Sequence, residues 1–166
     1  MTHADNKVEW CIKKAQKELA EGKIHRGLVK INSNPTLAFD HLRKAEHNLR
    51  AAIFFRENGY SDWSASAFFY CLYHCFLSIA LNYGYESRNQ DCTIAVVEML
   101  REQGMIKFDQ QFIEMVMMTA SKEMNLMAIR ENFQYGTKTS FDDGSDFEKL
   151  RLRCVEALEQ VRDIIT

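Results

Sequence analysis

The stretch FYCLYHCFLSIALNYG, residues 69–84, lies in the most apolar part of the chain, and we predict a helix around it over about 61–83. Apolar side chains occupy nearly the whole circumference of this helix, and such a helix is covered by neighbours on several sides. We therefore expect it to be the central helix of the fold, with a share in an oligomer interface as a further candidate role. The polar groups that interrupt the run favour a buried helix over a membrane span; they are Ser66, Tyr70, Tyr73, His74 and Ser78.

The rest of the chain is predicted to be helical as well. It holds one proline and seven glycines, while residues compatible with helices dominate. We expect further helices over about 35–57, 109–130 and 145–165, a shorter one that begins near Asp91 or Thr93, and an N-terminal helix that ends near Gly22. The prediction is an all-α, up-and-down helical bundle over 35–166, with an N-terminal helix and polar connector over 1–34.

Charge and cysteine content set the expected surroundings. The formal net charge is −2, so no global field draws the chain to nucleic acid, although a local basic groove is compatible with it. The first residues lack the apolar segment of a signal peptide. The five cysteines form no CxxC pair, and we expect free thiols in a reducing cytoplasm and no membrane association.

The central stretch resembles the second helix of HEPN-domain proteins, whose pattern is roughly YYAxFHAxxALLxxxG. The residues that fall on this pattern are Phe69, Tyr70, Tyr73, His74 and Gly84. The preceding LAFDHLRKAEHNLRAA and the later Arg130 and Tyr135 also fit, so the resemblance covers about 35–166. It implies a small helical bundle and a homodimer. It also implies a role as a toxin or as the partner of a nucleotidyltransferase or an antitoxin.

The segment IRENFQYGT, residues 129–137, is the first candidate site. Relatives that act as ribonucleases carry an Arg followed after four to six residues by a His. There the guanidinium would hold the scissile phosphate and the imidazole would move protons. Here Arg130 is followed by Tyr135, and tyrosine is a poor general base at neutral pH. On a helix, Arg130 and Gln134 share one face, and Glu131 and Tyr135 share the next.

Three readings of this segment stay open. In the first, Arg130 pairs with a carboxylate and Tyr135 packs against the last helix. In the second, the polar residues line a cleft between two protomers that contacts a ligand or RNA. In the third, the site cleaves RNA without a metal, with Arg130 on the phosphate and Tyr135, Glu131 or Asn132 assisting.

The polar decapeptide GYESRNQDCT, residues 84–93, is the second candidate. Helix capping and a surface Glu–Arg pair explain most of it, while Arg88 and Asn89 would be the ligands if a phosphate bound here. We expect His74 to be a hydrogen-bonded core histidine rather than a metal ligand, and His41 to be solvated. No metal or cofactor is predicted.

The resemblance and the missing histidine together favour a HEPN protein that is not an enzyme or has lost its catalysis. It would bind a nucleotide, RNA or a protein partner in a toxin–antitoxin or defence setting. The alternatives are a metal-independent endoribonuclease toxin that uses Arg130 and a purely structural dimeric interaction module.

Overall fold

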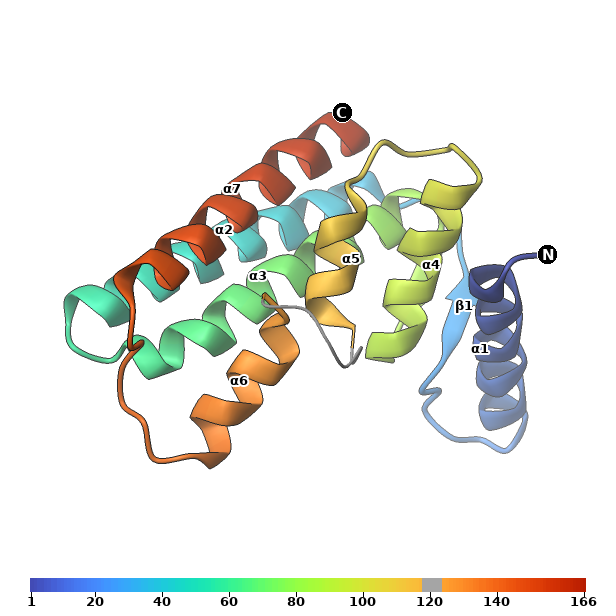
Figure 1. Cartoon of the computed structure of the whole chain (residues 1–166). Coiled ribbons are helices and arrows are strands. Elements are labelled where there is room, and N and C mark those ends of the chain that lie inside the picture. Colours follow the sequence, from blue (N-terminus) through green and yellow to red (C-terminus); the bar gives the residue numbers. More distant parts are fainter. Residues whose placement is uncertain (118–123) are drawn as a thin grey trace.

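The computed structural model describes residues 1–117 and 124–166 and confirms the all-α fold (Figure 1). Its elements are α1 (His3–Ala20), β1 (Leu28–Lys30), α2 (Pro35–Glu57), α3 (Ser61–Asn82), β2 (Tyr85–Ser87), α4 (Gln90–Glu102), α5 (Gln110–Val116), α6 (Leu126–Tyr135) and α7 (Gly144–Ile165).

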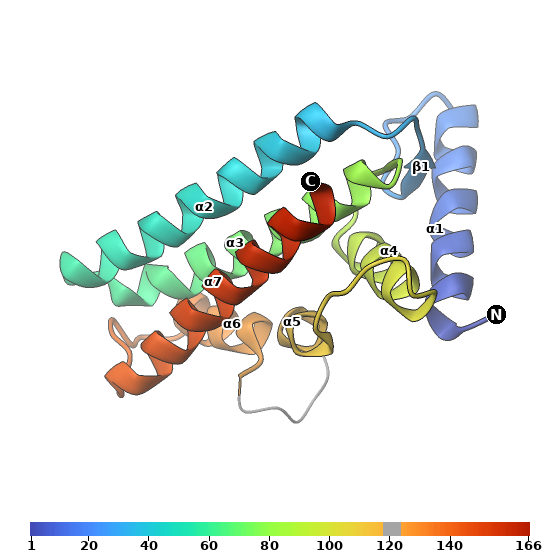
Figure 2. The same ribbon diagram turned by 90° about the horizontal axis from the view of Figure 1, so that it is seen from above.

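Helix α3 is central, as predicted. It packs against α2, α4, α5, α6 and α7, and α5 and α6 lie on the side of α3 away from α2 (Figure 2). Two serines join α3 to α2: Ser64 donates to the carbonyl of Ala52 and Ser78 to that of Ala38, each at 2.7 Å. By length and composition alone α3 could cross a membrane, but 72% of that apolar window is buried inside the protein. A helix covered to this extent by its neighbours is a core helix of the bundle.

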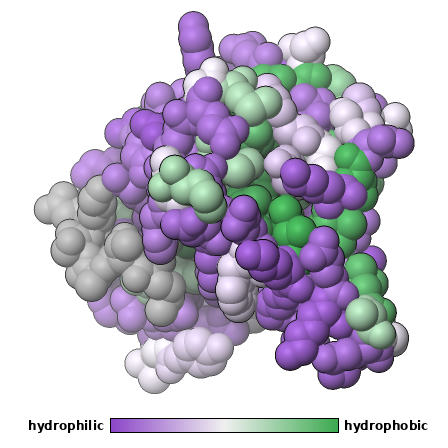
Figure 3. All heavy atoms as spheres, turned by 90° about the vertical axis from the view of Figure 1, so that its right-hand side faces the viewer, coloured by the Kyte–Doolittle hydropathy of each residue, from purple (hydrophilic) through white to green (hydrophobic). Residues whose placement is uncertain are grey.

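Helix α1 packs through a stripe of small and apolar residues onto α4 and β1. Thr2 and Asp5 begin it with a reciprocal capping box. Figure 3 faces this side of the molecule, where hydrophilic side chains predominate and apolar surface shows in patches. The N-terminal segment is thus held to the bundle along one edge.

The segment predicted as a polar connector contains a strand. β1 pairs antiparallel with β2, with Leu28 opposite Ser87. Gly27, just before β1, allows the chain to pass close to α1, because a Cβ at this position would lie 2.4 Å from the carbonyl oxygen of Cys11. Both strands have three residues, too few for an alternating pattern to be visible in the sequence.

The single helix predicted over 109–130 is wrong. Helix α5 ends at Val116, since Met117 has an extended backbone, and α6 begins after Asn125. The Asn125 side chain accepts a hydrogen bond from the amide of Ala128 at 2.9 Å and donates to the carbonyl of Met117. An asparagine in this position is a strong N-cap and favours a new helix start over a continuous helix. The predicted helix over 118–123 lies outside the described residues.

The expectation of five free thiols is also wrong. Cys11 of α1 and Cys92 of α4 form a disulfide across a sequence separation of 81, and both are fully buried. The remaining three cysteines are free and buried. Spacing could not reveal the pair, because only the packing of α1 on α4 brings the two sulfurs together.

His41, predicted to be solvated, instead contacts His74. Their Nδ1 atoms lie 2.8 Å apart and their rings are stacked, with both side chains half-buried. One Nδ1 must donate and the other accept, so protonation of the acceptor breaks the bond. Burial, and then the neighbouring His41 and Lys44, lowers the pKa of His74 to about 4. Burial also lowers the pKa of His41, against an opposing effect of Asp40.

The disulfide should stabilise the fold chiefly by restricting the unfolded chain. Reduction, or the double substitution Cys11→Ala/Cys92→Ala, should lower the free energy of unfolding by roughly 2–5 kcal/mol. Urea unfolding with and without a dithiol reductant measures this. The reductant should have no effect on the double variant, and an unchanged wild-type midpoint would contradict the prediction.

The histidine pair should make stability fall as the pH is lowered. Its pKa values are depressed in the folded state, so the unfolded chain binds more protons between the ordinary value near 6.5 and about 4. Stability is therefore greatest above pH 6.5 and falls through this window. Urea unfolding at pH 7.5 and 5 should show a smaller loss for His41→Asn/His74→Asn than for wild type. Equal losses would argue against the assignment, and exposed His47→Asn is the control.

Candidate functional site

A pocket of about 420 Å³ opens between the first half of α3 and α6. Its lining residues recur at helical spacing, so each helix presents one face to it; they are Asp62, Trp63, Ser66 and Tyr70 on α3 and Arg130, Phe133 and Gln134 on α6. The volume lies in the range of small-molecule sites. Here α3 is incompletely covered, since Trp63 is 60% and Tyr70 46% exposed. The pocket therefore combines aromatic surface with one cation and one carboxylate.

Arg130 is held in this pocket by aromatic contacts. Its guanidinium carbon lies 4.2 Å from the centre of the Phe69 ring and 5.9 Å from that of Tyr70. Cation–π contacts of this kind stabilise the position by about 0.5–2 kcal/mol. Because Phe69 is fully buried, the ring that supports the guanidinium is itself fixed by the core.

The N–H groups of Arg130 have no oxygen acceptor in the described part of the chain. Nη2 lies 3.6 Å from the sulfur of Met127, and Nε is buried without a partner. No carboxylate among the described residues lies within ion-pair distance of it. The simple reading, in which Arg130 pairs with a carboxylate, is therefore not what this structure shows. A buried N–H without an acceptor costs about 1–3 kcal/mol.

The other residues predicted around Arg130 separate into two groups. Gln134 lines the pocket with Arg130, as their spacing predicts. Tyr135 is 80% exposed and is not among the lining residues, so it neither faces Arg130 nor packs against α7. Asn132 lines a neighbouring hollow beside Phe141, and Glu131 is half-buried outside the pocket.

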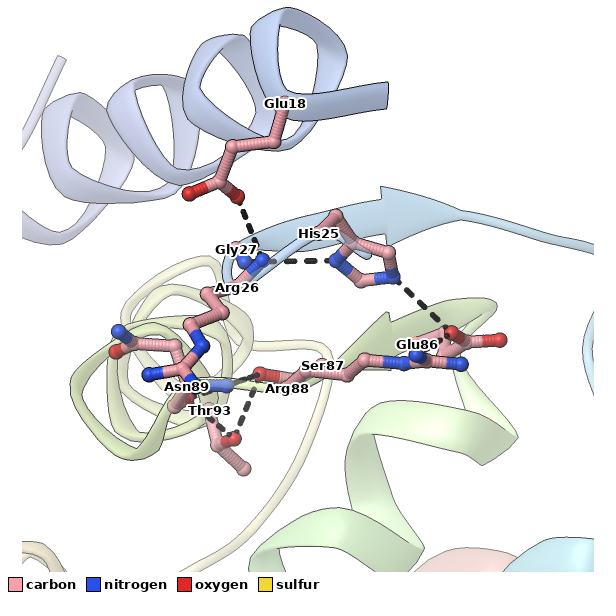
Figure 4. A network of polar contacts seen from close by, with 9 residues as sticks. All are labelled: Glu18, His25, Arg26, Gly27, Glu86, Ser87, Arg88, Asn89 and Thr93. Carbon is pink, nitrogen blue, oxygen red and sulfur yellow. Dashed lines mark hydrogen bonds and ion pairs between the residues drawn. The ribbon is translucent and has the colours of Figure 1, made fainter. Parts of the chain in front are cut away.

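Arg88 and Asn89 belong to a different region, beside α1 and α4 (Figure 4). Asn89 caps α4 by accepting from the amide of Cys92 at 3.1 Å. Nε of Arg88 lies 3.3 Å from Glu86, whose carboxylate is also 3.1 Å from Nε2 of buried His25. These contacts attach the segment before β1 to the bundle. They fit the capping and ion-pair reading, and Arg88 and Asn89 do not converge with Arg130.

The α3 side of the pocket was not anticipated from sequence. Asp62, Trp63 and Tyr70 are not among the candidate site residues predicted from the sequence, although Tyr70 was recognised as an interruption of the apolar run. The polar and amphipathic residues that interrupt this otherwise apolar helix indicate that one of its faces is exposed. The sequence does not show which face, because the exposed face depends on where α6 packs. Within the described residues, no group of three or more His, Cys, Asp or Glu side chains is placed to hold a metal ion.

The chain matches the model of one protein family over the region that contains the pocket. The model of the HEPN domain matches residues 38–166, which include both helices of the pocket and exclude α1 and β1. Searches among curated proteins and among solved structures gave no match. A match over most of the chain, together with the central apolar helix and the late Arg130, shows that this chain belongs to the HEPN-domain family.

Proposed function

We propose that this HEPN protein binds a nucleotide, free or as part of single-stranded RNA, in the Arg130 pocket and does not cleave it. Membership of the family supports a nucleotide- or RNA-related or toxin-type function in general. The observation that supports the finer proposal is the guanidinium of Arg130, which is held on Phe69, has no oxygen acceptor among residues 1–117 and 124–166, and lines a pocket of suitable size.

Phosphate is the anion that this guanidinium suits best. A guanidinium donates two parallel hydrogen bonds to two phosphate oxygens, and charge-assisted bonds of this kind are about twice as strong as neutral ones. Contact with Phe69 orients the guanidinium before the ligand arrives. Little ordering entropy is then lost on binding.

The aromatic residues of the pocket supply a place for a base. Trp63 and Tyr70 are exposed on the α3 side, and Phe133 lines the α6 side. Unstacked bases of single-stranded RNA bind to such side chains, and each base–aromatic stack contributes about 1–3 kcal/mol. A phosphate on Arg130 with a base against the aromatic residues would occupy both parts of the pocket.

The absence of a histidine in the pocket supports binding without cleavage. All five histidines of the chain precede residue 75, and none of them is among the described lining residues. Tyr135, at the position where active relatives place the histidine, is turned to solvent. A homodimer, and a nucleotidyltransferase or antitoxin partner in a toxin–antitoxin or defence setting, stay predictions from the resemblance.

Removal of the Arg130 charge should abolish most of the binding. Arg130→Met keeps an unbranched stem over Phe69 but removes the donors, so affinity for a 5′-nucleoside monophosphate should fall about 10-fold to 100-fold. Isothermal titration calorimetry measures it. Arg88→Met, which removes an arginine already paired with Glu86, is the matched control and should bind like wild type. Equal affinities for wild type and Arg130→Met would overturn the proposal.

RNA should survive prolonged incubation with the purified protein. We expect fluorescently labelled single-stranded RNA to stay intact between pH 6 and 9 in the presence of a chelator, while binding to it depends on Arg130. Cleavage by wild type that is lost in Arg130→Met would instead establish the endoribonuclease alternative.

A further inference from the structure

The Arg130 pocket contains a carboxylate that the binding of phosphate does not explain. Asp62 lines the pocket from the first turn of α3 and is half-buried. In the described part of the chain it has no hydrogen-bond or ion-pair partner, and it does not pair with Arg130 although both line the same cavity. From this juxtaposition we propose that the pocket selects guanine, with Asp62 as the residue that reads the base; this inference rests on the proposed nucleotide-binding function.

Asp62 and Arg130 give the pocket one charge of each sign. The formal charges of Asp62 and Arg130 cancel, so the pocket is not built for an anion alone. A carboxylate near a phosphate site weakens anion binding unless the ligand also presents donors to it. The ligand that suits this pocket therefore carries an anionic group at one end and N–H groups at the other.

The chemistry of a carboxylate narrows the choice among bases. An ionised carboxylate only accepts hydrogen bonds, and its two oxygens accept best from two donors side by side. On its Watson–Crick edge guanine presents N1–H next to the 2-amino group. Adenine and cytosine each place an amino donor beside an acceptor nitrogen, and uracil places its one N–H between two carbonyl oxygens. Guanine is thus the base that satisfies both oxygens of Asp62.

The neighbouring side chains complement the remaining groups of guanine. Gln134 offers an amide and Ser66 a hydroxyl to the same pocket, and either can donate to the guanine O6 or N7 acceptors. Trp63 follows Asp62 directly and is exposed, which provides a stacking surface beside the carboxylate. Each side chain of the pocket then binds one part of the ligand: Arg130 binds the phosphate, Asp62 binds the Watson–Crick edge, and the aromatic residues stack on the ring.

The test compares three ligands on the full chain by isothermal titration calorimetry: 5′-GMP, 5′-IMP, which lacks the 2-amino group, and 5′-AMP. Wild type should bind GMP roughly 10-fold to 100-fold more tightly than AMP, with IMP between them. In Asp62→Asn the amide replaces one acceptor by a donor and removes the charge that opposes the phosphate, so AMP should bind at least as tightly as to wild type and the ratio of GMP to AMP affinity should fall at least about tenfold. Asp91→Asn, which removes a carboxylate from the first turn of α4, is the matched control and should keep the preference.

The outcomes separate this inference from the proposed function. Equal binding of the three ligands, dependent on Arg130, would overturn guanine selection and leave nucleotide binding intact. A GMP preference that survives in Asp62→Asn would overturn the role of Asp62. Failure of wild type to bind any of the three ligands would overturn guanine selection, and failure to bind the labelled single-stranded RNA as well would overturn the proposed function. The comparison of ligands on wild type requires no substitution, so it decides base preference even if Asp62→Asn does not fold.

Discussion

Helix α3 has apolar side chains around most of its circumference and is covered by neighbours on several sides, and the other helices are arranged by this requirement. Burial of apolar surface contributes about 25 cal/mol for each square ångström, and the largest fully buried side chains include Phe68, Phe69, Leu72 and Phe76, all on α3. The few polar groups on the buried faces are satisfied locally. Ser64 and Ser78 donate to carbonyls of α2, so the polar interruptions in the sequence become attachment points between two helices.

The pocket lies where this covering is incomplete. Near its N-terminal end α3 is covered by the short helix α6, which leaves Trp63 and Tyr70 open to solvent. Asn125 begins α6 as a separate helix, and that start fixes the face on which Arg130 and Gln134 lie. Phe69 then connects core and site, because the ring packed in the centre of the bundle also supports the Arg130 guanidinium.

The N-terminal segment is attached to the bundle by covalent and polar contacts in addition to apolar packing. The Cys11–Cys92 disulfide, the β1–β2 pair and the His25–Glu86–Arg88 contacts all connect it to the edge formed by β2 and α4. This edge also reaches α6, because the side-chain amide of Gln90 at the start of α4 lies 3.7 Å from the sulfur of Met127, while α1 itself lies at the far side of α4 (Figure 1). The two candidate polar segments of the sequence thus differ in role: Arg88 and Asn89 belong to the attachment of the added helix, and Arg130 lines the pocket. They are joined through Met127, whose sulfur contacts both Gln90 and Arg130.

The sequence by itself determined the helical class, the central position of α3 and the membership of the HEPN family, because helical periodicity and an apolar circumference are local properties that one chain segment carries. It also placed Arg130 and Gln134 on one helix face. Only the tertiary structure decided that Asp62, Trp63 and Tyr70 face Arg130, that Tyr135 does not, that His41 meets His74, and that Cys11 bonds to Cys92. Each of these contacts depends on which helices pack together and in what position along their length. Residues far apart in the sequence come into contact through the packing of the whole core, and their sequence neighbours do not determine that packing.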